Sequence, residues 1–477
     1  MRYHFAKTLL LLLNCAAACL FWGCSNSEWA DLPNEEETVA EWEYPIANWE
    51  EEEEISENED NQAENASATS SSQTASTSSS SSAIKYLPID DTEYPYAGIP
   101  RIVIVTEKYQ EIKDRETEIP AKLQIWGEKA PESEIMDLTI RGRGNTSWEE
   151  MPKKSYKIEF IKKQSLLGMP KDRDWALIAN YADKTLMKNY LAYHLSAELG
   201  AFYAPRCDFV ELYLNKEYLG VYLLTETIKN SSHRVNIPQN DSSYIVEFDC
   251  RIRESEQNFH SFVIQNDSIG KGYHIHSPKD ISASSLQTIE NHILNFETYL
   301  KTINSNQDNF VAQWLDINEY IKHYWIQELS KNTDANFATS VYFSWTKGGV
   351  IKMGPVWDFD LAFGGSSNEI IALPESWHIK QAYWNTFLFK DSTFVHNTLN
   401  FWTNNKEQFK ALFRSIDSLN VVLQDASKNN FKRWNILTST KLVWHRNAYN
   451  TYNDAVNDLK KWIEQRISWI DSQLENQ

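Results

Sequence analysis

The feature that most constrains the fold is the stretch at residues 331–364, KNTDANFATSVYFSWTKGGVIKMGPVWDFDLAFG. Two β-rich runs, SVYFSW and VIKMGPVW, flank a TKGG turn, so the stretch predicts a β-hairpin. Asp334 precedes this hairpin, and Asp358 and Asp360 follow it. If the second strand stays extended through Phe359, both aspartates point to the same side of it. The chain must therefore fold so that a loop, a hairpin and a pair of carboxylates meet.

The chemistry of this aspartate pair favours a bound cation. Two carboxylates at this spacing repel each other, which raises the pKa of one of them unless a cation or a donor lies between them. Mg²⁺ suits such a pair, because it takes carboxylate oxygens and keeps positions for waters or substrate phosphates. Asp334 would then orient a nucleophile. A lone D-x-D also occurs as a turn cap beside aromatic residues, so the metal interpretation depends on the rest of the chain.

Charge separates a tail from the folded part. The 477 residues carry a formal net charge of -20, but residues 25–84 alone hold 16 acidic and no basic side chains. High charge followed by serine repeats cannot bury enough apolar surface to offset the chain entropy, so residues 24–84 are predicted to be a disordered tether. The charge argues against nucleic acid as a partner.

Residues 1–23, MRYHFAKTLLLLLNCAAACLFWG, combine a basic start with an apolar run too short to span a membrane comfortably. They resemble a bacterial lipoprotein signal peptide, with Cys24 as the lipidated first residue of the mature chain. An exported protein, anchored by lipid at the cell surface or in the periplasm, is therefore expected. The alternatives are a cleavage point at the AAAC segment that ends at Cys19, ordinary secretion and a retained anchor. Cys207 and Cys250 would then remain, either paired or as free thiols.

A glycine loop between two strands stands out in residues 85–229, in LTIRGRGNTSWEEMPKKSYKIEF. Gly142 and Gly144 let the backbone approach a ligand, and basic side chains such as Arg143 surround the turn, as a phosphate-binding loop requires. Lys154 shares a face with apolar residues of the second strand, which makes it the predicted phosphate contact. The alternative is a surface lysine whose stem lies along apolar surface.

The remaining patterns predict an α+β fold. A helix is expected from a cap at Asp183 to Gly200, and the hairpin FVELYLNKEYLGVYLLTETIK ends near Glu226. Residues 230–285 contain short strands and are predicted to be an inserted β subdomain, whereas residues 286–477 are mostly helical. We therefore expect a β-rich N-terminal lobe, a helical C-terminal lobe and a tether before them.

The order of these parts is that of a protein kinase: phosphate loop, lysine strand, helical lobe, aspartate loop and metal-binding aspartate. The usual GxGxxG, HRD and DFG motifs are absent. Instead, RGRGNTSW, KKSYKIEF, YLNKEYLGVYLLTETI, NTDANF and PVWDFDLAFG together resemble the spore coat protein H (CotH) kinase family, over roughly residues 100–475. The resemblance implies an atypical two-lobed kinase fold.

The resemblance also implies an activity: transfer of the γ-phosphoryl group of ATP, with Mg²⁺ or Mn²⁺, to Ser or Thr of a surface or secreted protein, a Ser-rich one among the candidates. It makes Asp334 the catalytic aspartate and Asp358 the metal-binding one, with Asp360 beside it. The further predicted contacts are Asn336 for the metal and Asn145, Lys154, Arg143 and Glu226 for the nucleotide. Asn336 lies closer to Asp334 than the corresponding Asn does in an ordinary kinase loop.

Two other classes of function stay open. A catalytically inactive, surface-anchored protein could keep the fold and bind a protein or glycan partner through aromatic side chains. A glycosidase could use Asp334 and Asp358 as its acid and base, but it would require a sugar-binding cleft that no sequence feature selects for. Nucleotide titration distinguishes the first of these from a kinase.

Overall fold

The computed structural model describes residues 86–252, 257–265, 268–305, 309–366, 368–441 and 447–475. All of them belong to one compact unit, Thr69–Gln477. The predicted signal peptide, lipidation site at Cys24 and tether lie outside the described residues. None of the helices in the described ranges is long and apolar enough to cross a membrane.

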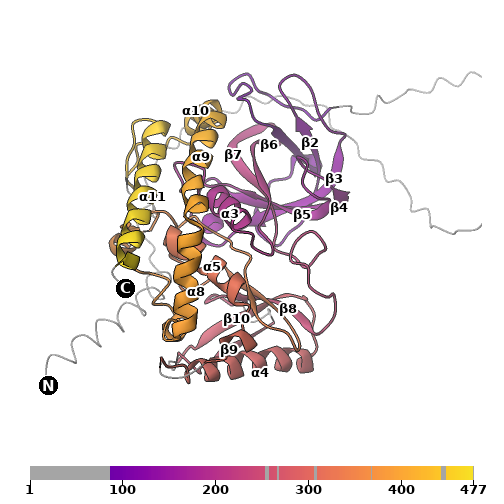
Figure 1. The fold of residues 1–477 in the computed structure, drawn as a ribbon. Helices are drawn as coiled ribbons and strands as arrows, with labels where there is room; N and C mark the ends of the chain where they lie inside the picture. The colour runs from indigo at the N-terminus through magenta and orange to yellow at the C-terminus, as the bar shows by residue number, and fades with distance from the viewer. Residues whose placement is uncertain are drawn as a thin grey trace, which may run out of the picture. The chain divides into compact units, whose positions relative to one another are not determined.

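Seven strands of the N-terminal part form a closed barrel in the order β1-β2-β3-β4-β5-β7-β6 (Figure 1). They are β1 (Arg101–Thr106), β2 (Ile119–Trp126), β3 (Met136–Arg143), β4 (Ser155–Gln164), β5 (Asp172–Ile178), β6 (Cys207–Leu214) and β7 (Glu217–Glu226). Successive strands pair antiparallel, and the parallel pairing of β1 with β6 closes the barrel.

Alternating side chains explain why these strands close on themselves. Every second residue points inward, and the inner positions are apolar and fully buried, as at Ile140, Ile158, Trp175 and Leu224. The mixed α+β class is therefore confirmed, but the predicted N-terminal lobe is a closed barrel and not clearly the open sheet of a two-lobed kinase. The difference arises because β6 returns beside β1, a long-range pairing.

A second sheet has the strand order β12-β11-β8-β10-β9. Its strands are β8 (Ser243–Phe248), β9 (Asn258–Ser261), β10 (Lys271–Ser277), β11 (Val341–Thr346) and β12 (Lys352–Met353). The predicted hairpin is thus present as β11 and β12, and β11 pairs antiparallel with β8. Residues 230–285 consequently do not form a separate β subdomain, because their strands complete the sheet that the hairpin begins.

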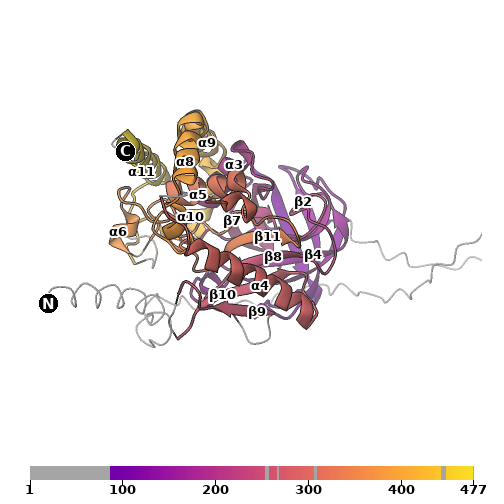
Figure 2. The ribbon, with the colours of Figure 1, turned by 60° about the horizontal axis from the view of Figure 1, so that its bottom comes forward.

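Helices surround the second sheet and reach the barrel. The longer ones are α3 (Lys188–Glu198), α4 (Ala283–Leu300), α5 (Ile317–Ser330), α8 (Ser392–Asn404), α9 (Lys406–Val422), α10 (Gln424–Arg433) and α11 (Tyr452–Glu475). The shorter ones are α2 (Thr146–Glu149), α6 (Glu369–Ala372) and α7 (Asn385–Leu388), besides two 3₁₀ turns at Glu107–Tyr109 and Val311–Gln313. Figure 2 shows α4 lying across β8, β9 and β10, and its apolar face is buried there at Ile289, Ile293 and Phe296.

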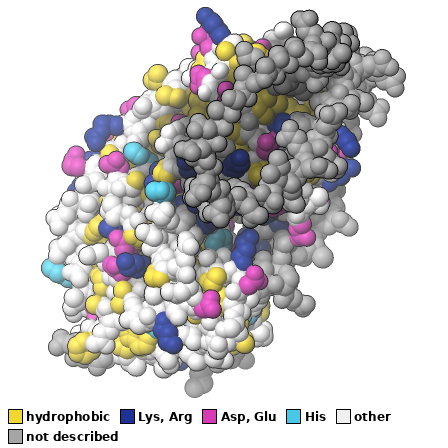
Figure 3. Space-filling view, turned by 90° about the vertical axis from the view of Figure 1, so that its right-hand side faces the viewer, with side chains coloured by type: hydrophobic (Ala, Val, Ile, Leu, Met, Phe, Trp, Pro, Cys, Tyr) yellow, Lys and Arg dark blue, Asp and Glu magenta, His cyan; other side chains and the backbone are white. Residues whose placement is uncertain are grey.

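The helix predicted from Asp183 begins later, at Lys188, because residues 184–187 form a turn. Asp183 still serves that turn, since its carboxylate accepts the backbone N–H groups of Thr185 (2.9 Å) and Lys188 (2.9 Å). No disulfide joins Cys207 and Cys250. On the face drawn in Figure 3, the described acidic and basic side chains are interspersed.

Candidate functional site

The loop that carries Asp334 begins where α5 ends. Lys331 adopts a left-handed conformation (φ +44°) that terminates the helix. Asn332 then donates from Nδ2 to the backbone oxygen of Asp358 (2.9 Å), and Thr333 donates to the backbone oxygen of Leu361 (3.0 Å). Two successive side chains therefore fasten the Asp334 loop to the segment that carries Asp358.

Asp334 and Asp358 are both half-buried, and they lie close enough to interact electrostatically. Burial and the negative charge of Asp358 raise the pKa of Asp334 to about 7, although the positive charge of Arg251 opposes the rise. Burial also raises the pKa of Asp358, which the charge of Arg143 and the hydroxyl of Ser340 partly offset. The structure thus brings the loop aspartate and the first D-x-D aspartate together, as the sequence predicts.

Asp358 and Asp360 do not lie on an extended strand, so the condition for the predicted common side of the two aspartates is not met. The second hairpin strand ends at Met353, and Asp358 adopts a left-handed conformation (φ +61°) that turns the chain. The Asp360 carboxylate instead accepts a hydrogen bond from Asn189 of α3 (2.7 Å). Burial and the charge of Asp358 raise its pKa to about 7.

Arg143, at the end of β3, is the barrel residue that reaches this site. Its guanidinium carbon lies 4.9 Å from the centre of the Trp357 ring, one residue before Asp358. Its charge lowers the pKa values of both Asp358 and Glu247, against the effect of burial. A cation that acts on two carboxylates is well placed to meet a phosphate group.

The glycine loop has a packing role. A Cβ at Gly142 would lie 2.5 Å from the Trp148 ring, and Gly144 has φ +101°. Lys154 donates to the backbone oxygen of Trp148, with its ammonium 5.6 Å from the ring centre, so it faces α2. Asn145 is exposed and accepts a hydrogen bond from Arg115 (2.6 Å). The described contacts therefore bring neither Lys154 nor Asn145 to the aspartates.

Glu226, another predicted contact, also lies elsewhere. Glu226 is fully buried, and its carboxylate accepts hydrogen bonds from Tyr203 (3.2 Å) and from the guanidinium (2.7 Å) and backbone (3.0 Å) of Arg206. These hydrogen bonds give the Glu226 carboxylate a structural role. Asn336 is exposed in the turn after Asp334, and its predicted role as a metal contact stays a prediction.

Strand β8 supplies site residues that the sequence analysis missed. Burial and the charge of Asp249 raise the pKa of Glu247 to about 8, with Tyr342 as a hydrogen-bonding neighbour. Asp249 in turn raises the pKa of Asp334 and accepts a hydrogen bond from Thr339 (3.1 Å). The segment YIVEFD does repeat the two-residue spacing of the WDFD segment, which was the available signal.

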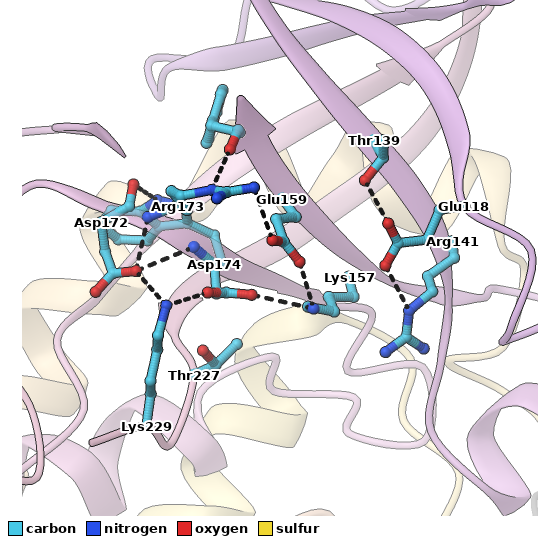
Figure 4. Close-up of polar contacts among 12 residues, drawn as sticks. Glu118, Thr139, Arg141, Lys157, Glu159, Asp172, Arg173, Asp174, Thr227 and Lys229 are labelled. Carbon is cyan, nitrogen blue, oxygen red and sulfur yellow. Dashed lines mark hydrogen bonds and ion pairs between the residues drawn. The ribbon is translucent and has the colours of Figure 1, made fainter. Parts of the chain in front are cut away.

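Lys157 lies on the outer face of the barrel, in a cluster of ion pairs. Its ammonium lies 2.9 Å from a Glu159 oxygen and 3.0 Å from an Asp174 oxygen, and Lys229 also binds Asp174 (Figure 4). Lys157 pairs across β3 and β4 with Arg141, two residues before Arg143. Side chains two residues apart share a strand face, so these three cations line one face.

The carboxylates fit a cation only in part. Within the described ranges, no group of three or more His, Cys, Asp or Glu side chains could hold a metal ion alone. The negative charge of Asp358 disfavours the charged form of Asp334, and a divalent cation near both carboxylates would reduce this repulsion. Mg²⁺ needs only one or two carboxylates when phosphates and waters supply its other oxygens. The donor set therefore fits a metal held jointly with a phosphate ligand.

A family model described as CotH kinase protein matches residues 140–470, which include Arg143, Asp334 and Asp358 and leave β1 and β2 outside. No curated protein matches the sequence.

Proposed function

The chain belongs to the CotH kinase family, and from that premise we propose that it is an extracytoplasmic protein kinase that phosphorylates Ser or Thr of a surface or secreted protein with ATP. The observation that carries the proposal is the electrostatic interaction of two half-buried carboxylates, because burial and the charge of Asp358 raise the pKa of Asp334 to about 7. The barrel and the part that contains α5 and the second sheet would act as the two lobes.

Asp334 is the proposed general base. A base with a pKa near the working pH combines a useful deprotonated fraction with enough basicity to take a proton. The substrate hydroxyl oxygen would form a bond to the γ-phosphorus while the bond from that phosphorus to the ADP oxygen breaks. Asp334 would accept the hydroxyl proton, and its half-buried position would keep bulk water from competing.

Asp358 is the proposed metal-binding aspartate, and Arg143 the proposed phosphate contact. When bound, Mg²⁺ or Mn²⁺ would neutralise the charge that develops on the phosphates. Arg143 lies beside Trp357 and acts electrostatically on Asp358, so it would hold phosphate oxygens next to the same carboxylate. Lys157, on the same barrel face, replaces Lys154 as the lysine that we propose for the nucleotide.

Phosphoryl transfer from γ-labelled ATP tests this proposal. The full chain with Mn²⁺ or Mg²⁺ should label itself or a Ser-rich protein, and Asp334→Ala should abolish the label. Asp425→Ala is the matched control, because Asp425 is an exposed residue of α10 whose carboxylate forms a surface ion pair with Lys428 (2.7 Å). No transfer, and no increase in Tm with ATP and Mg²⁺, would indicate instead a non-catalytic protein that binds a partner.

Export and lipid anchoring complete the proposal. Their support is the basic and apolar start of the chain and the cysteine that follows it, Cys24. Expression in a bacterium fed a labelled fatty acid should give a labelled, membrane-bound protein. Cys24→Ser should remove both the label and the membrane association, whereas an unlabelled wild-type protein would contradict the anchor.

A further inference from the structure

The segment at residues 368–376 turns its backbone toward the interior. Two almost fully buried cations, Lys331 and Arg466, donate hydrogen bonds to its carbonyl oxygens. The acceptors are the carbonyl oxygens of Ile370 (3.1 Å), Leu373 (2.7 Å) and Glu375 (2.6 Å) for Lys331, and those of Pro374 (2.8 Å) and Ser376 (2.7 Å) for Arg466. Because buried cations require such acceptors, these contacts hold the backbone of the segment in place.

Ile370 and Leu373 are large apolar side chains that this arrangement leaves at the surface. Ile370 is 69% exposed and Leu373 is 54% exposed. Ile370 lies in α6 and Leu373 follows that helix directly, and a spacing of three residues brings two side chains close together on a helical turn. Neighbouring exposed apolar side chains on a backbone held in place are typical of a surface that binds a partner.

The 368–376 segment is also fastened to the residues just before Asp334. Lys331 is three residues before that proposed base, and Nε2 of His378 lies 3.3 Å from the backbone oxygen of Thr333. A lysine side chain and three residues of chain together span at most about 18 Å, and an extended peptide covers about 3.3 Å per residue. A peptide bound at Leu373 therefore reaches Asp334 within about six residues.

Charge limits which partner this surface fits. The charged side chains of the 368–376 segment are Glu369 and Glu375, and both are exposed. Two carboxylates repel an anionic lipid surface and the acidic residues 25–84 of this chain, whereas they admit a neutral or basic partner. The surface therefore fits a peptide that carries an apolar side chain and no acidic residue beside it.

We infer that Ile370 and Leu373 form a docking surface for the protein substrate, which binds an apolar side chain of a non-acidic segment within about six residues of the accepting Ser or Thr. The inference rests on the proposed function and deepens it, since it states the chemistry of a second contact with the substrate. The pair holds the substrate near Asp334 and takes no part in the chemical step.

Degenerate peptides with one central Ser test the inference on the full chain, with γ-labelled ATP and Mn²⁺. One position at a time is fixed as Leu or as Ala, up to about six residues on either side of the Ser. At one or more of these positions, Leu should give about 5- to 20-fold more label than Ala, because docking removes an apolar side chain from water. Ile370→Asn combined with Leu373→Asn should reduce this preference to less than about twofold. Val421→Asn combined with Val422→Asn, an exposed pair at the end of α9, is the matched control and should keep the preference.

Reversing the charge of the segment gives a second test that a folding defect cannot imitate. In the wild type, Lys fixed beside the preferred Leu should give about two- to fivefold more label than Asp at the same position. In Glu369→Lys combined with Glu375→Lys, the order should reverse, because the peptide then meets ammonium groups in place of carboxylates.

Several results would overturn the inference and leave the kinase proposal intact. They are transfer to the chain itself or to the peptides without a preference for Leu at any position, and a preference that persists in the Ile370, Leu373 double variant. The inference also fails if that double variant keeps the preference and instead dissociates a wild-type dimer in analytical ultracentrifugation, or leaves phosphatidylglycerol vesicles to which the Cys24→Ser protein binds. If the wild type transfers phosphate neither to itself nor to any peptide mixture, the proposed function itself fails, and the inference fails with it.

Discussion

Replacing Asp334 with Asn should make the protein more stable at pH 8 while abolishing its activity. In the folded protein, burial and the charge of Asp358 raise the pKa of Asp334 to about 7, against 3.8 for an ordinary aspartate. The folded state therefore binds this proton more tightly than the unfolded state does. Between pH 4 and pH 7 the contribution of Asp334 to stability must fall as pH rises.

The size of the effect follows from that difference. Each pH unit between the folded and unfolded pKa values corresponds to about 1.4 kcal/mol, so the upper limit at pH 8 is about 4 kcal/mol. Asp334 is half-buried, and solvent screening reduces the expected gain for Asp334→Asn to about 1–3 kcal/mol at pH 8. At pH 4 the carboxyl is almost fully protonated in the folded state and only partly ionised in the unfolded state, so the gain should be a small fraction of its value at pH 8.

Urea unfolding at pH 4.5 and pH 8, with a chelator present, measures this change. Asp174→Asn is the control of opposite sign. Burial raises the pKa of Asp174, but the hydrogen bonds and charges of Lys229 and Lys157 outweigh it and lower the pKa to about 2. That variant should lose stability at pH 8. If Asp334→Asn is less stable than the wild type at pH 8, or if the difference is the same at both pH values, the electrostatic account of the site is refuted.

Three further substitutions give separate tests. Arg466→Met breaks a fully buried ion pair with Glu328 (2.6 Å) and should lower the free energy of unfolding, measured in urea, by about 3 kcal/mol or more. If the double variant Glu328→Gln, Arg466→Met loses as much stability as the single variant, this reasoning is contradicted. Gly220→Ala should lower the free energy of unfolding by about 1–3 kcal/mol in the same assay, because Gly220 has φ +95° and a Cβ would lie 2.5 Å from Oδ1 of Asn430. An unchanged stability would show that the Asn430 side chain moves away without cost. Arg143→Gln should reduce the rate of phosphoryl transfer about 10- to 100-fold, whereas Lys154→Gln should keep a rate within about twofold of the wild type. The opposite result would support Lys154 as the phosphate contact.

Local patterns predicted the elements around the site. The TKGG turn and its β-rich flanks gave the β11–β12 hairpin, and the placement of Asp334 and Asp358 at its two ends correctly predicted that they would meet. The alternation in β4 correctly placed Tyr156 and Ile158 inside. These features depend on neighbours in sequence, which is why they could be predicted.

Long-range pairing and single backbone angles could not be predicted in the same way. Closure of the barrel requires β6 to pair with β1, and completion of the second sheet requires β11 to pair with β8. The turn within the D-x-D segment depends on the left-handed conformation of Asp358, which an aspartate tolerates without any mark in the sequence. Lys154 was misplaced because β4 begins only at Ser155, so the alternation of that strand does not extend to it.

A crystal structure with Mn²⁺ and a non-hydrolysable ATP analogue tests the central claim most directly. The account predicts an anomalous Mn²⁺ peak bound by the Asp358 carboxylate, with Arg143 on a phosphate and the γ-phosphorus next to Asp334. A Mn²⁺–nucleotide complex bound away from Asp334 and Asp358, or no bound nucleotide at saturating concentration, would contradict it.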